Sequence, residues 1–242
     1  MEVEPPSVTM NGMSQRKTAF VEGEYYHIYN RGVDKRNIFS NEDDVDRFFQ
    51  SMIEFNVIEP IGSIYENSFN KQLGGSTSKL KEEDGELVDF VAYCLNANHY
   101  HFLVMQTADR GIEKFMHRLS TGYTMYFNEK EKRNGSLFQG RFKAVHIDSN
   151  EYLLHLSAYV NLNDRVHQLG GSTSKLVESR SSWEEYTEKG KMADGICEKE
   201  IILEQFKNVN EYKKFALSSL DDIVSRRKRQ SGVTLMLIEE IA

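Results

Sequence analysis

Two neighbouring strand-forming runs constrain the fold of this chain most. The first run, Val88 to Leu95, is rich in β-branched and aromatic residues, and the second begins with His99-Tyr100-His101 and continues through Phe102 to Met105. Only the turn-like Asn96-Ala97-Asn98 separates them, which predicts a pair of antiparallel strands. Because side chains alternate between the two faces of a strand, we expect His99 and His101 on one face, close enough to share a metal ion.

The rest of the chain completes an α+β pattern. Alternating or aromatic runs predict strands over 24–30 and 141–147, and three-to-four spacing of apolar residues predicts helices over 42–53 and 111–132. Ser149 is expected to open a further helix over 149–163. Ser40 or Asn41 is placed to cap the first helix, which has acidic residues in its first turn. The order β-α-β-β-α-β-α predicts a ferredoxin-like or RRM-like antiparallel sheet with helices mainly on one face.

Composition changes along the chain divide it into four segments. We expect a flexible N-terminal lead-in over residues 1–18, a main domain over 19–165, a polar loop region over 166–197 and a helical C-terminal extension over 198–242. A nine-residue repeat, Gln72 to Leu80, recurs as Gln168 to Leu176. The repeat is too short for a solenoid, and its Gly, Ser and Thr content favours surface loops that arose from a duplicated or inserted DNA segment.

The charge of the chain bears on how it could bind nucleic acid. The net charge of −7 over 242 residues argues against a protein that coats nucleic acid through bulk electrostatics. The charge is uneven, however: residues 110–147 hold eight Lys or Arg and three acids, whereas residues 40–90 hold twelve acids and four Lys or Arg. A phosphate backbone could lie along the basic stretch.

The two cysteines have no CxxC spacing, so the sequence indicates neither a disulfide framework nor a zinc knuckle. Because the sequence has no apolar run long enough to span a membrane and no signal pattern, we expect a cytoplasmic protein with no membrane partner.

A phenol and a carboxamide stand close together in the last predicted helix of the main domain. Tyr159 and Asn163 are four residues apart, so one continuous helix would place them on one face. Asn161 is the nearest rival to Asn163 as a metal ligand, but its spacing of two residues turns it away from that face. Other tyrosines, Tyr123, Tyr126 and Tyr152, are better explained as core or stacking residues.

With these residues the chain resembles the REP-associated tyrosine transposases, the single-tyrosine branch of the HUH endonucleases. The similarity covers residues 20–163 and is carried by four ordered stretches: Tyr26 to Gly32, Tyr93 to Phe102, Leu137 to Lys143 and Tyr159 to Asn163. One position departs from the family pattern, because Asp164 stands where the family usually has proline. We therefore expect the helix end after Asn163 to be shaped differently.

The resemblance implies a DNA-processing enzyme that acts on palindromic repeats. It implies binding of single-stranded or hairpin DNA, cleavage of one strand and a covalent 5′-phosphotyrosine intermediate on Tyr159, in a monomer or a homodimer. His99, His101 and Asn163 are then the expected ligands of Mg²⁺ or Mn²⁺, and no small-molecule cofactor is needed.

Four residues beside turns are the candidates for contact with DNA. Arg31, Arg141 and Lys143 can reach a phosphate backbone, and Gln139 can read a base edge.

Two other functions compete with this hypothesis. A non-catalytic single-stranded DNA- or RNA-binding module would use the same kind of sheet and present aromatics such as Tyr25 and Tyr29 for base stacking. Alternatively, the histidines would only complete a core in a structural protein.

Overall fold

The computed structural model describes residues 18–62, 64, 85–168, 177–188 and 195–230. The expected N-terminal lead-in lies outside the described residues except for its last position. Both copies of the nine-residue repeat also lie outside them, apart from Gln168.

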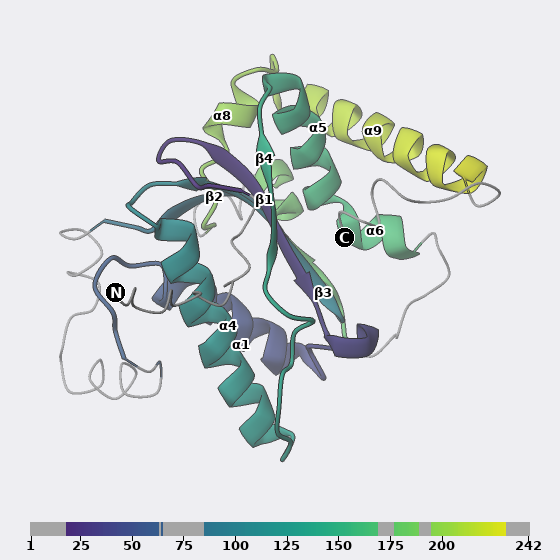
Figure 1. Ribbon diagram of the computed structural model, residues 1–242. Helices are drawn as coiled ribbons and strands as arrows, with labels where there is room; N and C mark the ends of the chain where they lie inside the picture. Colours follow the sequence, from purple (N-terminus) through teal and green to yellow (C-terminus); the bar gives the residue numbers. More distant parts are fainter. Residues whose placement is uncertain (1–17, 63, 65–84, 169–176, 189–194, 231–242) are drawn as a thin grey trace, which may run out of the picture.

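A five-stranded antiparallel sheet forms the centre of the described chain (Figure 1). Its strands lie in the order β4-β1-β3-β2-β5. The bounds are β1 Tyr25–Arg31, β2 Val88–Asn96, β3 His99–Gln106, β4 Lys143–Ile147 and β5 Arg180–Ser181. The expected α+β class with an antiparallel sheet is confirmed, and β5 adds a strand at the β2 edge that was not expected.

Helices follow the strands in the expected succession. Their bounds are α1 Glu42–Glu54, α4 Gly111–Lys130, α5 Asn150–Asn161, α6 Asn163–Gln168, α7 Trp183–Thr187, α8 Glu200–Leu203 and α9 Val209–Gln230, with a short 3₁₀ helix, η1, over Val33–Lys35. Asn41 is the N-cap of α1 because its side chain accepts a 3.2 Å hydrogen bond from the backbone N–H of Asp44. This cap is one of the two that the sequence predicted.

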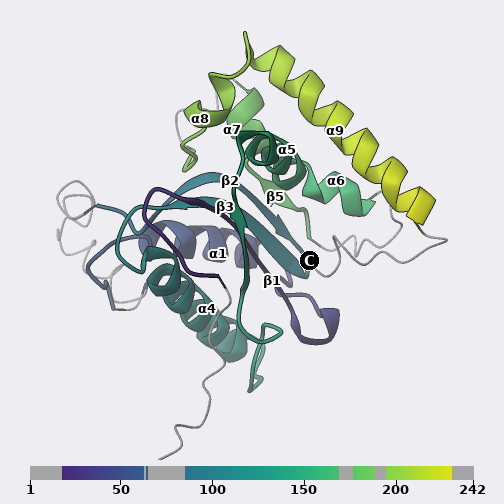
Figure 2. The same ribbon diagram turned by 45° about the horizontal axis from the view of Figure 1, so that its top comes forward.

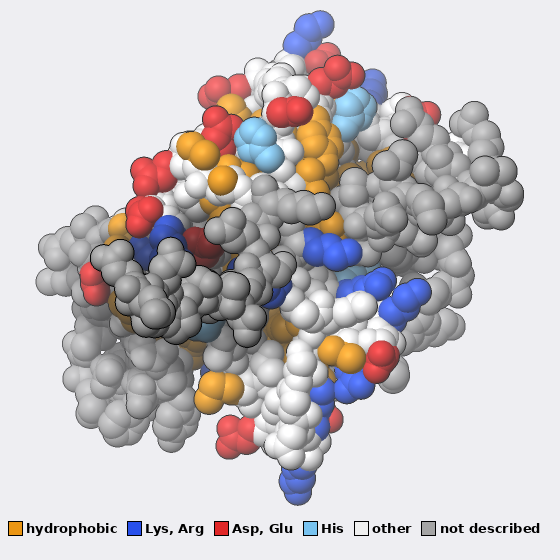
Figure 3. All heavy atoms as spheres, in the orientation of Figure 1, with side chains coloured by type: hydrophobic (Ala, Val, Ile, Leu, Met, Phe, Trp, Pro, Cys, Tyr) orange, Lys and Arg blue, Asp and Glu red, His pale blue; other side chains and the backbone are white. Residues whose placement is uncertain are grey.

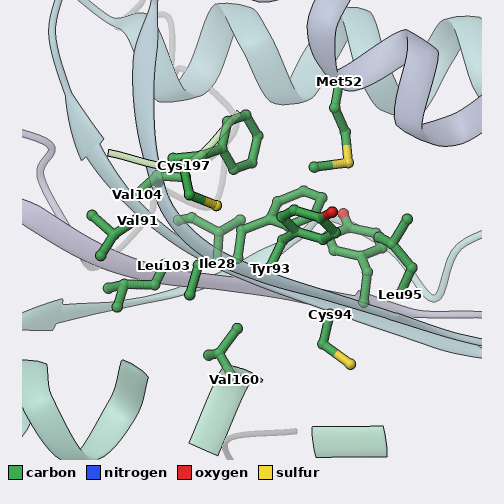
Figure 4. Packing of buried hydrophobic residues seen from close by; sticks show 14 of the residues in the cluster. Ile28, Met52, Val91, Tyr93, Cys94, Leu95, Leu103, Val104, Val160 and Cys197 are labelled. Atoms are coloured by element: carbon green, nitrogen blue, oxygen red, sulfur yellow. The ribbon is translucent and has the colours of Figure 1, made fainter. Parts of the chain in front are cut away.

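Helices cover both faces of the sheet, which is broader than the one-sided arrangement we expected. Figure 2 shows α1 and α4 on one side of the sheet and α5, with α9 outside it, on the other. In Figure 4, Met52 of α1 and Val160 of α5 approach the strands from opposite sides. The physical reason lies in β2 and β3, whose residues are buried nearly without interruption, so both faces require an apolar cover.

The segment over 166–197, expected as a polar loop region, contains ordered elements in its described part. β5 pairs with β2, and Ser182 donates its backbone N–H to the carbonyl of Tyr93. The buried Tyr186 of α7 donates a 2.7 Å hydrogen bond to the carbonyl of Val91. A few large side chains therefore anchor this otherwise polar stretch to the edge of the sheet.

Two further expectations concern thiols and membranes. Cys94 and Cys197 are both buried free thiols. Among the described residues, no helix has the length and apolarity that crossing a bilayer requires.

Candidate functional site

The candidate site lies where β1 and β3 run beneath α5 (Figures 1 and 2). The antiparallel register of β1 and β3 sets Tyr29 opposite His101 and Arg31 opposite His99. Tyr159 and Val160 come from the last turn of α5, which packs on β2 and β3. Three elements far apart in the sequence thus supply the side chains of one site.

The two histidines of β3 lie side by side, as the strand period predicted. Their ring centroids are 5.2 Å apart and their planes are nearly perpendicular. His101 is 1 % exposed, whereas His99 is partly exposed. Since one imidazole is open and the other enclosed, the site sits at the margin of the core.

Tyr159 packs against the enclosed histidine. Its side chain is 8 % exposed, and its ring centroid lies 5.5 Å from that of His101 in an edge-on arrangement. The rival tyrosines of α4 lie elsewhere: Tyr123 donates a 2.7 Å hydrogen bond to the carbonyl of Ile38, and the hydroxyl of Tyr126 donates to Asp44. Because α4 covers the opposite face of the sheet, neither is near the histidines.

Asn163 reaches the site, but not as part of the same helix as Tyr159. The expected continuous helix is interrupted: α5 ends at Asn161, and Leu162 has φ −112° and ψ 15°. Asn163 is the first residue of α6, and its Oδ1 lies 3.2 Å from Nε2 of His99. Leu162, the residue at the break, is fully buried.

The donor atoms around His99 suit a divalent cation. Nδ1 of His99 lies 2.6 Å from Oδ1 of Asn98, which can only accept, so Nδ1 carries the proton and Nε2 keeps a lone pair. Asn96 Nδ2 donates to Asn163 Oδ1 at 2.8 Å and lies 3.1 Å from His99 Nε2. Two acceptors therefore converge on one donor, and a cation bound by both would replace that donor.

One donor group of the site is unpaired. Nδ2 of the buried Asn163 has no hydrogen-bond partner among the described residues, whereas most buried polar groups have one. The described residues hold no cluster of three His, Cys, Asp or Glu side chains that could bind a metal. Two imidazoles and one amide oxygen leave coordination positions for water and phosphate oxygens, as Mg²⁺ and Mn²⁺ sites that act on phosphates require.

Asn161, the alternative candidate for a metal ligand, is hydrogen-bonded to other side chains. Its Nδ2 donates a 2.8 Å hydrogen bond to the hydroxyl of Tyr212 in α9, and its Oδ1 accepts a 2.6 Å hydrogen bond from Ser182. All three side chains are fully buried. The amide of Asn161 therefore joins α5 to the C-terminal part of the chain.

His27 of β1 is a third imidazole at the site that the sequence analysis did not single out. Its Nε2 lies 2.9 Å from Nδ1 of His101, and its ring is 6.2 Å from that of Tyr159. Burial lowers the pKa of His27 to about 3, so the ring is neutral at ordinary pH. The alternation of β1 could have marked His27 as lying on the same face as Tyr29, but its partner depends on strand pairing.

The candidate DNA-contacting residues gather at one end of β1 and β4. Arg31 donates from Nε to Oε1 of Gln139, and the backbone N–H of Gln139 donates to the carbonyl of Arg31 at 2.8 Å. Lys143 lies opposite Tyr29 in the β1–β4 pair, with its ammonium 5.7 Å from the centre of that ring. Arg141 is exposed on the connection between Gln139 and Lys143.

This basic end is adjacent to the histidines. Tyr29 pairs with Lys143 on one side and with His101 on the other, so about 10 Å, two strand spacings, separates the basic edge from the site. Figure 3 shows Lys and Arg side chains gathered on the face that carries the lower part of β4. Burial and the neighbouring Tyr152 and Tyr159 raise the pKa of Tyr29 to about 12.

One part of the chain matches the model of a known family. The family model described as "Transposase IS200 like" matches residues 63–163, which include both strand histidines, Tyr159 and Asn163. The expected resemblance to this kind of transposase is confirmed over that range. No curated protein matches the sequence.

Two solved structures share part of the arrangement at low identity. A REP-associated tyrosine transposase bound to a REP hairpin is 13 % identical, with a TM-score of 0.44 over 64 % of this chain and 74 % of that one. A tRNA(His) guanylyltransferase from Saccharomyces cerevisiae is 12 % identical, with a TM-score of 0.33 over 64 % of this chain and 65 % of that one.

Proposed function

We propose, on the premise that residues 63–163 match the IS200-like transposases, that this protein is a metal-dependent single-stranded DNA endonuclease and strand transferase. Its substrate is hairpin DNA at palindromic repeats, and its intermediate is a 5′-phosphotyrosine. We further propose that it acts in the cytoplasm, as a monomer or a homodimer, without a small-molecule cofactor.

One observation carries the proposal: the ring of Tyr159 lies 5.5 Å from that of His101, in a site where His99 Nε2 and Asn163 Oδ1 face a common point. A candidate nucleophile and a set of cation-binding atoms thus lie in the same site between α5 and β3. Their proximity supports a reaction at phosphorus, because such a reaction depends on positioning and on neutralising charge on the phosphate oxygens.

Tyr159 is the nucleophile in this mechanism. Its hydroxyl gives up a proton, its oxygen forms a bond to phosphorus, and the bond from phosphorus to the 3′ oxygen breaks; that oxygen takes up a proton and leaves as a 3′-hydroxyl. A bound divalent cation, held by His99, His101 and Asn163, would act as a Lewis acid toward the phosphate. A free 3′-hydroxyl can attack the phosphotyrosine in turn, which rejoins strands without ATP.

The basic end of β1 and β4 holds the DNA backbone in this proposal. Arg31, Arg141 and Lys143 neutralise phosphates on the strand that enters the site, and Gln139 contacts a base edge. The Arg31–Gln139 hydrogen bond keeps these two side chains together before DNA arrives.

A labelled hairpin oligonucleotide tests the proposal. With Mn²⁺, the wild type is expected to form a covalent protein–DNA adduct that survives denaturing electrophoresis, and EDTA is expected to prevent it. Tyr159→Phe should give no adduct while still shifting the oligonucleotide in a native gel. Tyr152→Phe, on the same helix, is the matched control and should retain the adduct. An intact oligonucleotide with the wild type, or an adduct with Tyr159→Phe, would overturn the proposal.

The competing non-catalytic module is less well supported. Sheets that bind single strands by stacking present exposed aromatic rings, whereas Tyr29 is 4 % exposed beside the elements that cover this face. Tyr25 is partly exposed but lies at the other end of β1 from the basic residues.

A further inference from the structure

His27 is a buried side chain to which the proposed reaction assigns no role. It sits on β1, is 2 % exposed, and directs Nε2 at Nδ1 of His101 over 2.9 Å. The two rings are nearly parallel, with centroids 5.1 Å apart. This hydrogen bond links a candidate metal ligand of β3 to a side chain of the neighbouring strand β1.

The hydrogen bond between two imidazoles requires a choice of tautomer. If His101 donates from Nδ1, then its Nε2 is unprotonated and has a lone pair for a cation. If His27 donates from Nε2 instead, then the proton of His101 sits on Nε2, and this nitrogen cannot be a ligand. The pair therefore has one arrangement that permits metal binding and one that blocks it.

His99 shows what the permissive arrangement looks like. Its Nδ1 faces Oδ1 of Asn98, an atom that only accepts, so the lone pair of His99 is directed through Nε2 towards Asn163. In the permissive tautomer, His27 gives His101 the acceptor that Asn98 gives His99. Histidine ligands of metals ordinarily donate their second ring N–H to such a partner.

We propose that His27 is a positioning residue that accepts the Nδ1 hydrogen of His101 and so keeps Nε2 of His101 available to a divalent cation. This inference rests on the proposed function, because it assumes a cation at His99, His101 and Asn163. Without His27, the buried Nδ1–H of His101 would lose its acceptor whenever the metal is bound, and the affinity for metal would fall.

A calorimetric titration of the full chain with Mn²⁺ alone tests this role. His27→Leu keeps an apolar filling but no acceptor, and is expected to bind Mn²⁺ about 10- to 100-fold more weakly than the wild type. His27→Gln places an acceptor oxygen near the position of the lost Nε2 and is expected to restore most of the affinity. Thermal unfolding of the three proteins without metal checks that both variants are folded.

The outcomes separate the two proposals. If His27→Leu binds Mn²⁺ as tightly as the wild type, the role of His27 is wrong although the metal site remains. If His27→Leu and His27→Gln lose the same Mn²⁺ affinity, His27 acts only through packing and the proposed role is also wrong. A wild type that does not bind Mn²⁺ would overturn the metal site and this inference with it.

A second measurement reads the tautomer directly. In a ¹⁵N NMR experiment on the wild type saturated with Mg²⁺, His101 is expected to be protonated at Nδ1 and unprotonated at Nε2. The opposite assignment would contradict the role proposed for His27.

Discussion

Ser182 donates a 2.6 Å hydrogen bond to the side chain of Asn161, two residues beyond Tyr159. Ser182 lies outside the range that matches the transposase family, between β5 and α7. Tyr212 of α9 accepts from the same amide, and Ser179 donates a 3.0 Å hydrogen bond to Asn96 beside the candidate site. The C-terminal part of the chain therefore braces the end of α5 through buried polar contacts.

Removal of this brace should destabilise the fold. Ser182→Ala leaves Asn161 Oδ1 buried without its donor, and we expect the free energy of unfolding to fall by about 1–3 kcal/mol. Urea unfolding followed by circular dichroism measures the change. Ser181→Ala, at the neighbouring and less buried position, is the control and should change stability little. Equal stability of Ser182→Ala and the wild type would show that the brace contributes nothing.

Loss of a basic residue at the end of β4 should weaken DNA binding in a salt-dependent way. Arg141→Ala removes an exposed cation, and we expect the slope of log K against log salt for a single-stranded oligonucleotide to decrease by about 0.7 if Arg141 neutralises one phosphate. Fluorescence anisotropy at several salt concentrations gives the slope. Lys114→Ala on α4 removes a similar exposed charge on the opposite side of the sheet, and an equal effect there would exclude a localised interface.

Replacement of Asn163 should show whether its amide oxygen, rather than its packing, contributes to metal binding. Asn163→Leu removes the amide oxygen near His99, and we expect Mn²⁺ affinity to fall by at least about tenfold. Asn163→Asp keeps an oxygen donor at the same place and should retain Mn²⁺ binding. Calorimetric titration of both variants makes the comparison. Unchanged affinity in Asn163→Leu would remove Asn163 from the ligand set.

The carboxyl of Asp89 in β2 should make stability depend on pH. Burial, and then the nearby Glu198, raise the pKa of Asp89 above its ordinary value of 3.8. The folded state therefore holds this proton more tightly than the unfolded state, and the stability that Asp89 contributes is complete below pH 3.8 and lost as pH rises through the raised pKa.

We therefore expect Asp89→Asn to be more stable than the wild type at neutral pH and to approach it below pH 3.8. Thermal unfolding across this pH range measures the difference. Asp109→Asn, in the exposed turn before α4, should show little difference at either pH. A variant of Asp89 that is less stable at neutral pH would show that the carboxylate is favourable where it lies.

Some elements of the site follow from local sequence. The period of two in β3 placed His99 and His101 together, because a strand imposes that alternation wherever it packs. Asn41 and Ser149 mark the starts of α1 and α5 because each side chain accepts a backbone N–H three residues ahead. The expected helical period did not extend through Leu162, a fully buried residue at which the helix is interrupted between Tyr159 and Asn163.

By itself, the sequence determined strands β1 to β4, the starts of α1, α4 and α5, and the paired imidazoles, since each depends on residues a few positions apart. Packing of α5 on β3 brought Tyr159 to His101. The tertiary structure alone decided that His27 meets His101, that Asn161 is held by Ser182 and Tyr212, and that helices cover both faces of the sheet. These contacts join residues 21 to 74 positions apart, and they arise from strand register and from the need to bury apolar surface on both faces.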